Sequence, residues 1–180
     1  MEIISSNPKQ YCRLSLLKTK LNIQDDVQDE YLKKIIEQNS SVIDTLTNRE
    51  FNEQIVKETF HNVRGMVLLN ITPIKKINSI IADNRNIEDY IVLEDSGIVL
   101  IYGTFSRVEV TYEAGFDTNE ENFEIPRDIE KACLELCLYQ INGERQVLSE
   151  KIGDYQVQYQ DALNVYQSVN EILKNWRRIE

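Results

Sequence analysis

The sequence has 180 residues, of which 42% are hydrophobic and 28% are charged, and it contains only 6 Gly and 3 Pro. These proportions are typical of a folded globular protein and argue against long disordered segments. Acidic residues outnumber Lys and Arg by 30 to 20, so the net charge is −10. Proteins that bind duplex DNA do so through clustered cations, and no such cluster occurs in this acidic sequence, which argues against that class.

Two helices are predicted near the N-terminus. The first lies within residues 11–23, where Leu14, Leu17 and Leu21 recur at spacings of three and four. The second is clearer and spans roughly residues 26–47, with polar side chains on its other face. Its apolar face consists of Leu32, Ile35, Ile36, Val42, Ile43 and Leu46.

From Ile55 the apolar period changes from 3.6 towards 2, which favours short strands. Turn-forming residues separate the apolar runs, and the sequence Glu94-Asp95-Ser96-Gly97 between two of them predicts a hairpin. The predicted strands are residues 55–61, 66–69, 77–82, 90–93, 98–101 and 108–112.

Helical spacing returns after Pro126, a residue that suits the first turn of a helix. This helix is apolar on nearly every side, which is typical of a central, buried helix. Residues 155–159 alternate between large apolar side chains and Gln, and this alternation predicts a short extended arm. A last helix follows, with an apolar repeat close to 3.5 residues and a basic C-terminal end.

Together these patterns predict an α+β protein that is mainly a helical bundle of about four helices with an inserted small β-sheet subdomain. The helical domain comprises residues 1–53 and 114–180, and the β subdomain comprises residues 54–113. Because the sequence contains no phosphate-binding loop, nucleophile elbow or histidine-paired nucleophile, we expect no enzymatic activity.

Three cysteines, Cys12, Cys133 and Cys137, occur in a sequence with no secretory signal and no apolar run of membrane-spanning length. An odd number of cysteines without a signal predicts free thiols in a reducing compartment, so we expect a soluble protein of the cytosol. Nothing near Cys133 and Cys137 completes the four ligands of a zinc site, and His61, the single histidine, lacks ligand partners at suitable spacing. We therefore predict no metal and no cofactor.

The order of several short motifs resembles the head–tail connector (adaptor) family of long-tailed bacteriophages, over roughly residues 10–160. No motif is diagnostic alone, and their joint order carries the resemblance. The motifs are Leu21-Asn22-Ile23, Asp44-Thr45-Leu46-Thr47-Asn48-Arg49-Glu50-Phe51, Leu69-Asn70-Ile71-Thr72-Pro73-Ile74, Val108-Glu109-Val110-Thr111-Tyr112-Glu113-Ala114-Gly115-Phe116, Ile125-Pro126-Arg127-Asp128-Ile129 and Glu150-Lys151-Ile152-Gly153-Asp154-Tyr155-Gln156-Val157.

The resemblance implies a structural virion protein that forms a ring, commonly dodecameric in the family, under the portal protein. Such a ring extends the DNA channel and docks the head-completion (stopper) or tail-completion protein, while DNA passes through its lumen without specific binding. The implied location is the head–tail interface of the virion, after assembly in the host cytoplasm, and no membrane is involved.

The resemblance also implies that the C-terminal segment reaches the portal. Aromatic and Arg residues are frequent anchors of interfaces, and filling of the protein's own core is the alternative interpretation of the aromatic ones. The candidate portal or subunit contacts are Tyr155, Tyr159, Tyr166, Ile172, Leu173, Trp176 and Arg177.

A monomeric acidic binding module, such as a regulator or a DNA mimic, is the alternative function. A ring, or a monomer that becomes a ring on a portal, favours the connector. A stable monomer that competes with DNA for a basic partner favours the mimic.

Overall fold

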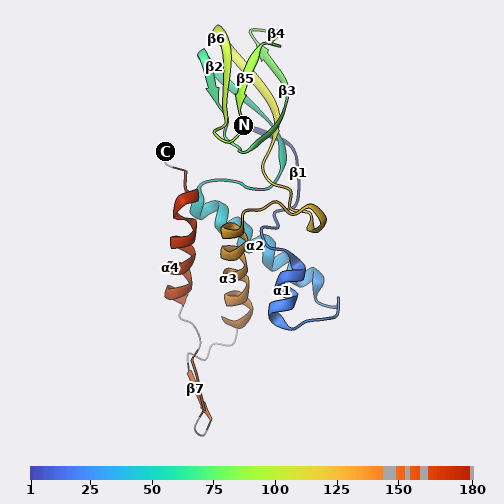
Figure 1. The fold of residues 1–180 in the computed structure, drawn as a ribbon, viewed down its shortest axis with the longest axis vertical. Helices are drawn as coiled ribbons and strands as arrows, with labels where there is room; N and C mark the ends of the chain where they lie inside the picture. The colour runs from blue at the N-terminus through green and yellow to red at the C-terminus, as the bar shows by residue number, and fades with distance from the viewer. Residues whose placement is uncertain (144–148, 153–154, 159–161, 179–180) are drawn as a thin grey trace. The chain divides into compact units, whose positions relative to one another are not determined.

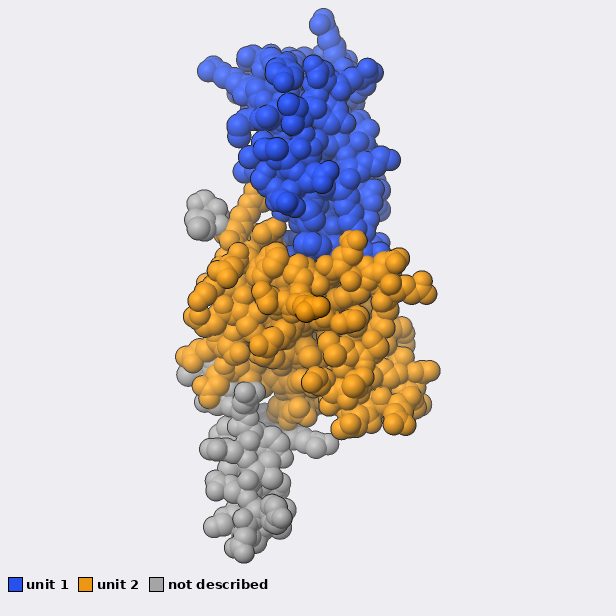
Figure 2. Space-filling view, viewed as in Figure 1, with its two compact units in different colours: residues 1–8, 50–118 blue, residues 9–49, 119–180 orange. Residues whose placement is uncertain are grey.

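The computed structural model describes residues 1–143, 149–152, 155–158 and 162–178. The chain divides into two compact units (Figure 2). Unit 1 consists of Met1–Pro8 and Glu50–Thr118, and unit 2 consists of Lys9–Arg49 and Asn119–Glu180.

Unit 1 is a six-stranded antiparallel sheet in which two long strands, β2 and β6, form the centre (Figure 1). The strand order is β1-β2-β6-β3-β4, and β5 pairs with a further part of β6. The strands are β1 (Glu2–Ser6), β2 (Gln54–Leu68), β3 (Ile74–Ala82), β4 (Arg85–Asn86), β5 (Tyr90–Leu93) and β6 (Ile98–Ala114).

The long strands curl, so that the sheet closes part-way into a half-barrel. Their pairing shifts register between Arg64 and Met66, opposite a stretch of β6 where Gly103 has a φ of 131°. A bulge of this kind bends a strand and increases its twist without ending the pairing. The backbone N–H of Ile71, just after β2, donates to the Tyr112 hydroxyl on β6 at 3.1 Å.

The inside of the half-barrel is a hydrophobic core that belongs to unit 1 alone. Side chains at alternate positions of β2 and β6 face inward, as the period-2 geometry of strands requires. The buried residues are Val56, Val63, Val67, Leu69, Ile71, Ile74, Ile80, Ala82, Val99, Ile101, Val108, Val110, Tyr112 and Ala114.

The expectation of a mainly helical bundle with a small inserted sheet is therefore wrong. The predicted strands 55–61 and 66–69 are one strand, β2, and the predicted strands 98–101 and 108–112 are one strand, β6. These strands have 15 and 17 residues and build a large curled sheet with its own core. The sheet also includes β1, an edge strand that the sequence analysis did not identify.

Unit 2 contains the helices α1 (Leu14–Leu21), α2 (Asp29–Thr47), α3 (Arg127–Gly143) and α4 (Ala162–Leu173), and the short 3-10 turns η1 (Glu120–Asn122) and η2 (Lys174–Trp176). Helix α3 packs on α1, α2 and α4, which confirms its expected central position. Asn22 and Asn48 end α1 and α2 in the left-handed conformation, which Asn tolerates better than most residues.

The predicted helices at residues 11–23 and 26–47 correspond to α1 and α2. The alternating segment after α3 forms strand β8 (Tyr155–Gln158), which pairs with β7 (Ser149–Ile152) in an antiparallel hairpin. The core of unit 2 is formed by Tyr11, Cys12, Leu14, Leu17, Leu32, Ile35, Ile36, Ile43, Ile129, Ala132, Cys133, Leu136, Cys137, Val165, Val169 and Leu173.

Candidate functional site: surfaces for assembly

The described part of the chain contains no group of three or more His, Cys, Asp or Glu side chains that could hold a metal ion. Cys12, Cys133 and Cys137 are buried free thiols in unit 2. Burial raises the pKa of the Cys12 and Cys133 thiols, which keeps them protonated and poorly reactive. Among the described helices, none is both long and apolar enough to cross a membrane.

Arg13, at the start of α1, is joined to Glu130 on α3 by a two-pronged ion pair. Its Nε donates to Oε1 at 2.8 Å and its Nη2 donates to Oε2 at 3.1 Å. The guanidinium also lies over the Phe123 ring, 5.4 Å from the ring centroid. The two parallel hydrogen bonds match the planar guanidinium of Arg13 to the carboxylate of Glu130. The hydrogen bond to Glu130 raises the pKa of Arg13. The ion pair also fixes the segment before α1 against α3.

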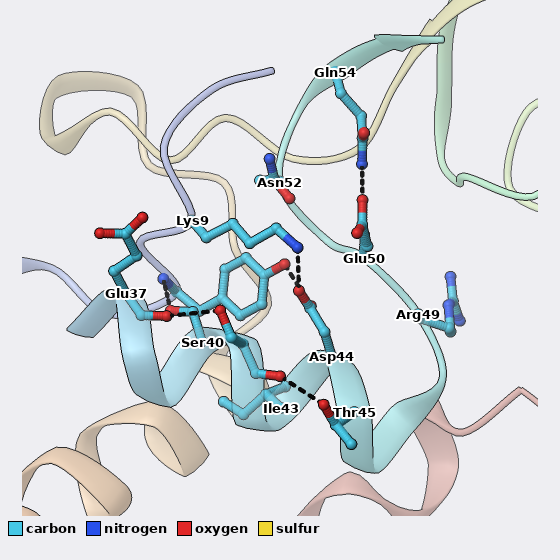
Figure 3. A network of polar contacts seen from close by, with 12 residues as sticks. Lys9, Glu37, Ser40, Ile43, Asp44, Thr45, Arg49, Glu50, Asn52 and Gln54 are labelled. Atoms are coloured by element: carbon cyan, nitrogen blue, oxygen red, sulfur yellow. Dashed lines mark hydrogen bonds and ion pairs between the residues drawn. The ribbon is translucent and has the colours of Figure 1, made fainter. Parts of the chain in front are cut away.

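Asp44 on α2 holds the preceding N-terminal segment of unit 2 (Figure 3). Its carboxylate accepts from the Tyr11 hydroxyl at 2.6 Å and from Lys9 Nζ at 2.7 Å. One turn earlier, Ser40 Oγ accepts from the Tyr11 backbone N–H at 3.0 Å. At the end of α2, the Thr47 carbonyl accepts from the Arg178 N–H at 2.9 Å, so the chain beyond α4 is also tied to α2.

Glu58 on β2 is buried in the core of unit 1 and is surrounded by hydrogen-bond donors. Its carboxylate accepts from the Asn70 N–H at 3.0 Å, from Asn70 Nδ2 at 2.6 Å and from the Tyr112 hydroxyl. Burial and the hydrogen bond to Glu58 raise the pKa of Tyr112. The network pins the loop after β2 onto the central strands, so the Leu69-Asn70-Ile71 motif has a structural role.

Several acidic residues between positions 109 and 130 take part in local contacts. Glu109 pairs with Lys57 Nζ at 3.0 Å and Glu120 accepts from the Ser15 N–H at 3.0 Å. Glu113 lies beside Glu53, and their shared hydrogen bond raises the pKa of Glu113. These contacts give the acidic residues of this segment a structural role.

Helix α4 and the segment just after it carry five of the seven predicted contact residues, but not all of these reach the surface. Leu173 is fully buried, and Ile172 and Trp176 are partly buried. Tyr166 is 43% exposed and packs edge-to-face on Tyr139, with ring centroids 6.4 Å apart.

Arg177 is exposed and donates to Asn170 Oδ1 at 2.9 Å. The side chain of Tyr155 and the whole of Tyr159 lie outside the described residues. The predicted set is therefore divided between an exposed part and a part that fills the core of unit 2.

A second apolar surface lies on the outward side of β2, β5 and β6. Met66, Leu100 and Ile91 are opposite one another in one cross-strand row, and Leu68, Ile98 and Leu93 form the next row. Tyr102 extends the outward side of β6. We call these seven residues the outer patch.

The sequence model of the head completion protein family matches residues 14–179, which is nearly the whole chain. The chain belongs to the head completion protein family. The resemblance to phage head–tail connector proteins is thereby confirmed at the level of the family, and this head completion protein is a structural protein of the phage virion.

Solved structures with a similar fold come from gene transfer agent (GTA) particles. The neck of an empty GTA particle with C6 symmetry contains a chain with a TM-score of 0.65 and 13% identity, covering 99% of this chain and 95% of that chain. A chain of the native GTA virion has a TM-score of 0.63 and 12% identity, covering 99% of this chain and 95% of that chain. A chain of the native GTA neck with C12 symmetry has a TM-score of 0.59 and 15% identity, covering 99% of this chain and 94% of that chain. At this identity the likeness establishes the fold alone. No curated protein is significantly similar to this head completion protein.

The outer patch was not predicted as a candidate surface from the sequence. Its residues alternate with buried ones along β2 and β6, where Val67 and Val99 on the opposite side face the core. A strand sequence that is apolar on both sides is typical of a fully buried strand, so it does not by itself predict an exposed surface. The signal that could have revealed the patch is the absence of polar residues from the outward positions of these strands.

Proposed function

We propose that this protein is a head–tail connector that assembles into a ring under the portal, extends the DNA channel and docks the stopper or tail-completion protein. The family match over residues 14–179 carries the proposal. Two of the similar solved chains belong to necks with C6 or C12 symmetry, and cyclic symmetry is the arrangement that a ring requires.

The exposed residues of α4 and the segment after it are the proposed portal contacts. Tyr166 and Arg177 are available at the surface, and Trp176 and Ile172 are partly available. Aromatic and Arg side chains contribute strongly when an interface desolvates them. Leu173 contributes indirectly, because it anchors α4 in the core of unit 2.

The net charge of −10 suits a channel for DNA. A surface without clustered cations does not replace the counterions of DNA, so the DNA slides past it without a stable complex. The ring therefore guides DNA without binding it specifically.

Deletion of the gene from the phage that encodes this protein tests the function. We expect heads that package DNA but remain without tails, and we expect the wild-type gene supplied in trans to restore tailed particles. Tailed, infectious particles of normal yield from the deleted phage would contradict the proposal.

The same complementation assay tests the portal contacts. Arg177→Glu combined with Tyr166→Ser should reduce the yield of tailed particles, while Lys34→Glu, at an exposed position on α2, should leave it unchanged. If both variants complement equally well, α4 is not the contact surface.

A further inference from the structure

The outer patch is apolar surface that unit 1 does not cover. Met66, Leu68, Ile91 and Leu93 are each 46–50% exposed, and Tyr102 is 68% exposed. None of the seven patch residues carries a charge, on a protein with a net charge of −10. Soluble monomers rarely expose apolar patches larger than about a few hundred Å², and such patches often mark interaction sites.

Strand β1 is a second exposed apolar feature of unit 1, and it differs from the outer patch. It is an edge strand, paired on one side with β2. Ile3 and Ile4 are 49% and 56% exposed, and the pairing with β2 shifts register between Ile3 and Ser5. A bulge leaves an extra residue unpaired, so Ile4 is exposed and pairs with no residue of β2.

Charged residues lie beside both surfaces, because Arg64, Glu94 and Asp95 flank the outer patch and Glu2 precedes Ile3. Of these, Arg64 and Glu2 have opposite charges. Arg64 is exposed on β2, two residues before Met66, and Glu2 is exposed on β1 beside Ile3. Within the described residues neither Arg64 nor Glu2 has an ion-pair partner. Complementary charges around an apolar contact fix its orientation and disfavour wrong partners.

We propose that the outer patch of one copy binds strand β1 of the neighbouring copy, an inference that rests on the ring proposed above. Head-to-tail contacts in a ring need two different, complementary surfaces on each copy. Unit 1 supplies both within one compact body. Ile3 and Ile4 cover the patch, and Glu2 pairs with Arg64 of the neighbour.

The size of the patch sets the strength of this contact. Its seven residues are well below the roughly 20–30 residues per partner that are typical of a stable pair. The contact is therefore too weak to hold two free copies together and forms only where other contacts already hold the copies in a ring. The appropriate sample for a test is the assembled virion.

Cross-linking of virions tests the contact. The phage gene is replaced by the full-length Ile4→Cys, Leu68→Cys variant, and purified virions are treated with a short bismaleimide. The three native thiols are buried, so the reagent reaches the introduced ones. Both substituted positions are about half exposed, so the variant should melt at the wild-type temperature.

We expect a ladder of covalent dimers and larger multimers of this chain on a denaturing gel. The matched control is Ile4→Cys, Ile81→Cys, because Ile81 is an exposed apolar residue of β3 outside the patch and should give monomers only. Adding Arg64→Glu to the patch variant should weaken the ladder, and further addition of Glu2→Arg should restore its intensity.

Three outcomes would overturn the inference. If the variant is present in tailed virions but gives monomers only, the contact does not exist, although the ring stands. If the patch cysteine is joined to a different virion protein, the occupant is that protein and not a second copy. If even the wild-type chain is absent from tailed virions, the proposed function fails, and the inference fails with it.

Discussion

Glu58 is a carboxylate inside the hydrophobic core of unit 1, and an unpaired charge in such a place is very costly. Two donors from Asn70 and the Tyr112 hydroxyl compensate for the lost hydration. The Tyr112 hydroxyl also accepts from the Ile71 N–H at 3.1 Å, so this one oxygen satisfies two buried groups.

Tyr112→Phe tests this network. The substitution removes one donor to Glu58 and leaves the Ile71 N–H without its acceptor, so we expect a loss of about 1–3 kcal/mol in the free energy of unfolding. Urea denaturation followed by circular dichroism measures the loss. Tyr102→Phe, at an exposed position, is the matched control and should leave the unfolding free energy unchanged.

The pH dependence of this difference has a definite sign. The pKa of Tyr112 is raised in the folded protein above its ordinary value of about 10. Its contribution is therefore fully present below pH 10 and is lost as the pH rises further, because only the unfolded state then ionises. The stability difference between wild type and Tyr112→Phe should shrink above pH 10, and a difference that grows there would contradict the network.

Glu113→Gln tests the carboxylate pair with Glu53. The hydrogen bond shared with Glu53 raises the pKa of Glu113, so at neutral pH the folded state holds two carboxylates close together. We expect Glu113→Gln to stabilise the protein at pH 7. The gain should vanish as the pH falls below about 4, where the wild-type Glu113 is protonated in both states. Thermal melting between pH 3 and 8 measures it, and an equal gain at every pH would rule out the pair as its cause.

At the scale of elements, replacing Gly by Ala is expected to have opposite effects on stability at the end of β6 and at the end of α3. Gly115, just after β6, has a φ of 100°, and a Cβ there would lie 2.3 Å from the Asn52 carbonyl oxygen. Gly115→Ala should therefore cost on the order of 2–6 kcal/mol, through backbone strain and overlap.

Gly143, the last residue of α3, has only ordinary contacts around a Cβ, the closest at 3.7 Å to the Tyr139 ring. Gly143→Ala should stabilise the protein by up to about 1 kcal/mol, since Ala favours helix. Chemical denaturation of both variants measures these changes. If both substitutions change the free energy of unfolding in the same direction, the backbone geometry described for Gly115 is wrong.

The helices were predicted well because their signal is local. The apolar spacing of Leu32, Ile35, Ile36 and Ile43 depends only on helix geometry, and these side chains are buried as expected. The last helix was also predicted, although its repeat did not reveal that Val165, Val169 and Leu173 face the core and Tyr166 faces outward.

The sheet was underestimated because its signal is not local. Gly65 and Gly103 are turn-forming residues that interrupt apolar runs of the sequence, whereas the pairing of β2 with β6 continues past both. A bulge and a turn use the same residue types, and only the partner strand distinguishes them. Strand β1 is exposed along its whole length, so it shows no alternation that could predict it.

At the scale of the whole molecule, the family could be inferred from the order of motifs, but the surfaces could not. Leu173 and Tyr166 are both apolar positions of α4, and the sequence alone does not say which of them faces a partner. The outer patch depends on three strands meeting in register, which no single segment encodes. Assembly surfaces of this kind emerge only from the folded chain.

Electron cryo-microscopy of the purified protein mixed with the portal of its own phage tests the central claim most directly. The account predicts a closed ring of this chain on one face of the portal, coaxial with the portal channel. Portals that remain bare, or that carry isolated copies without a closed ring at saturating protein concentration, would contradict it.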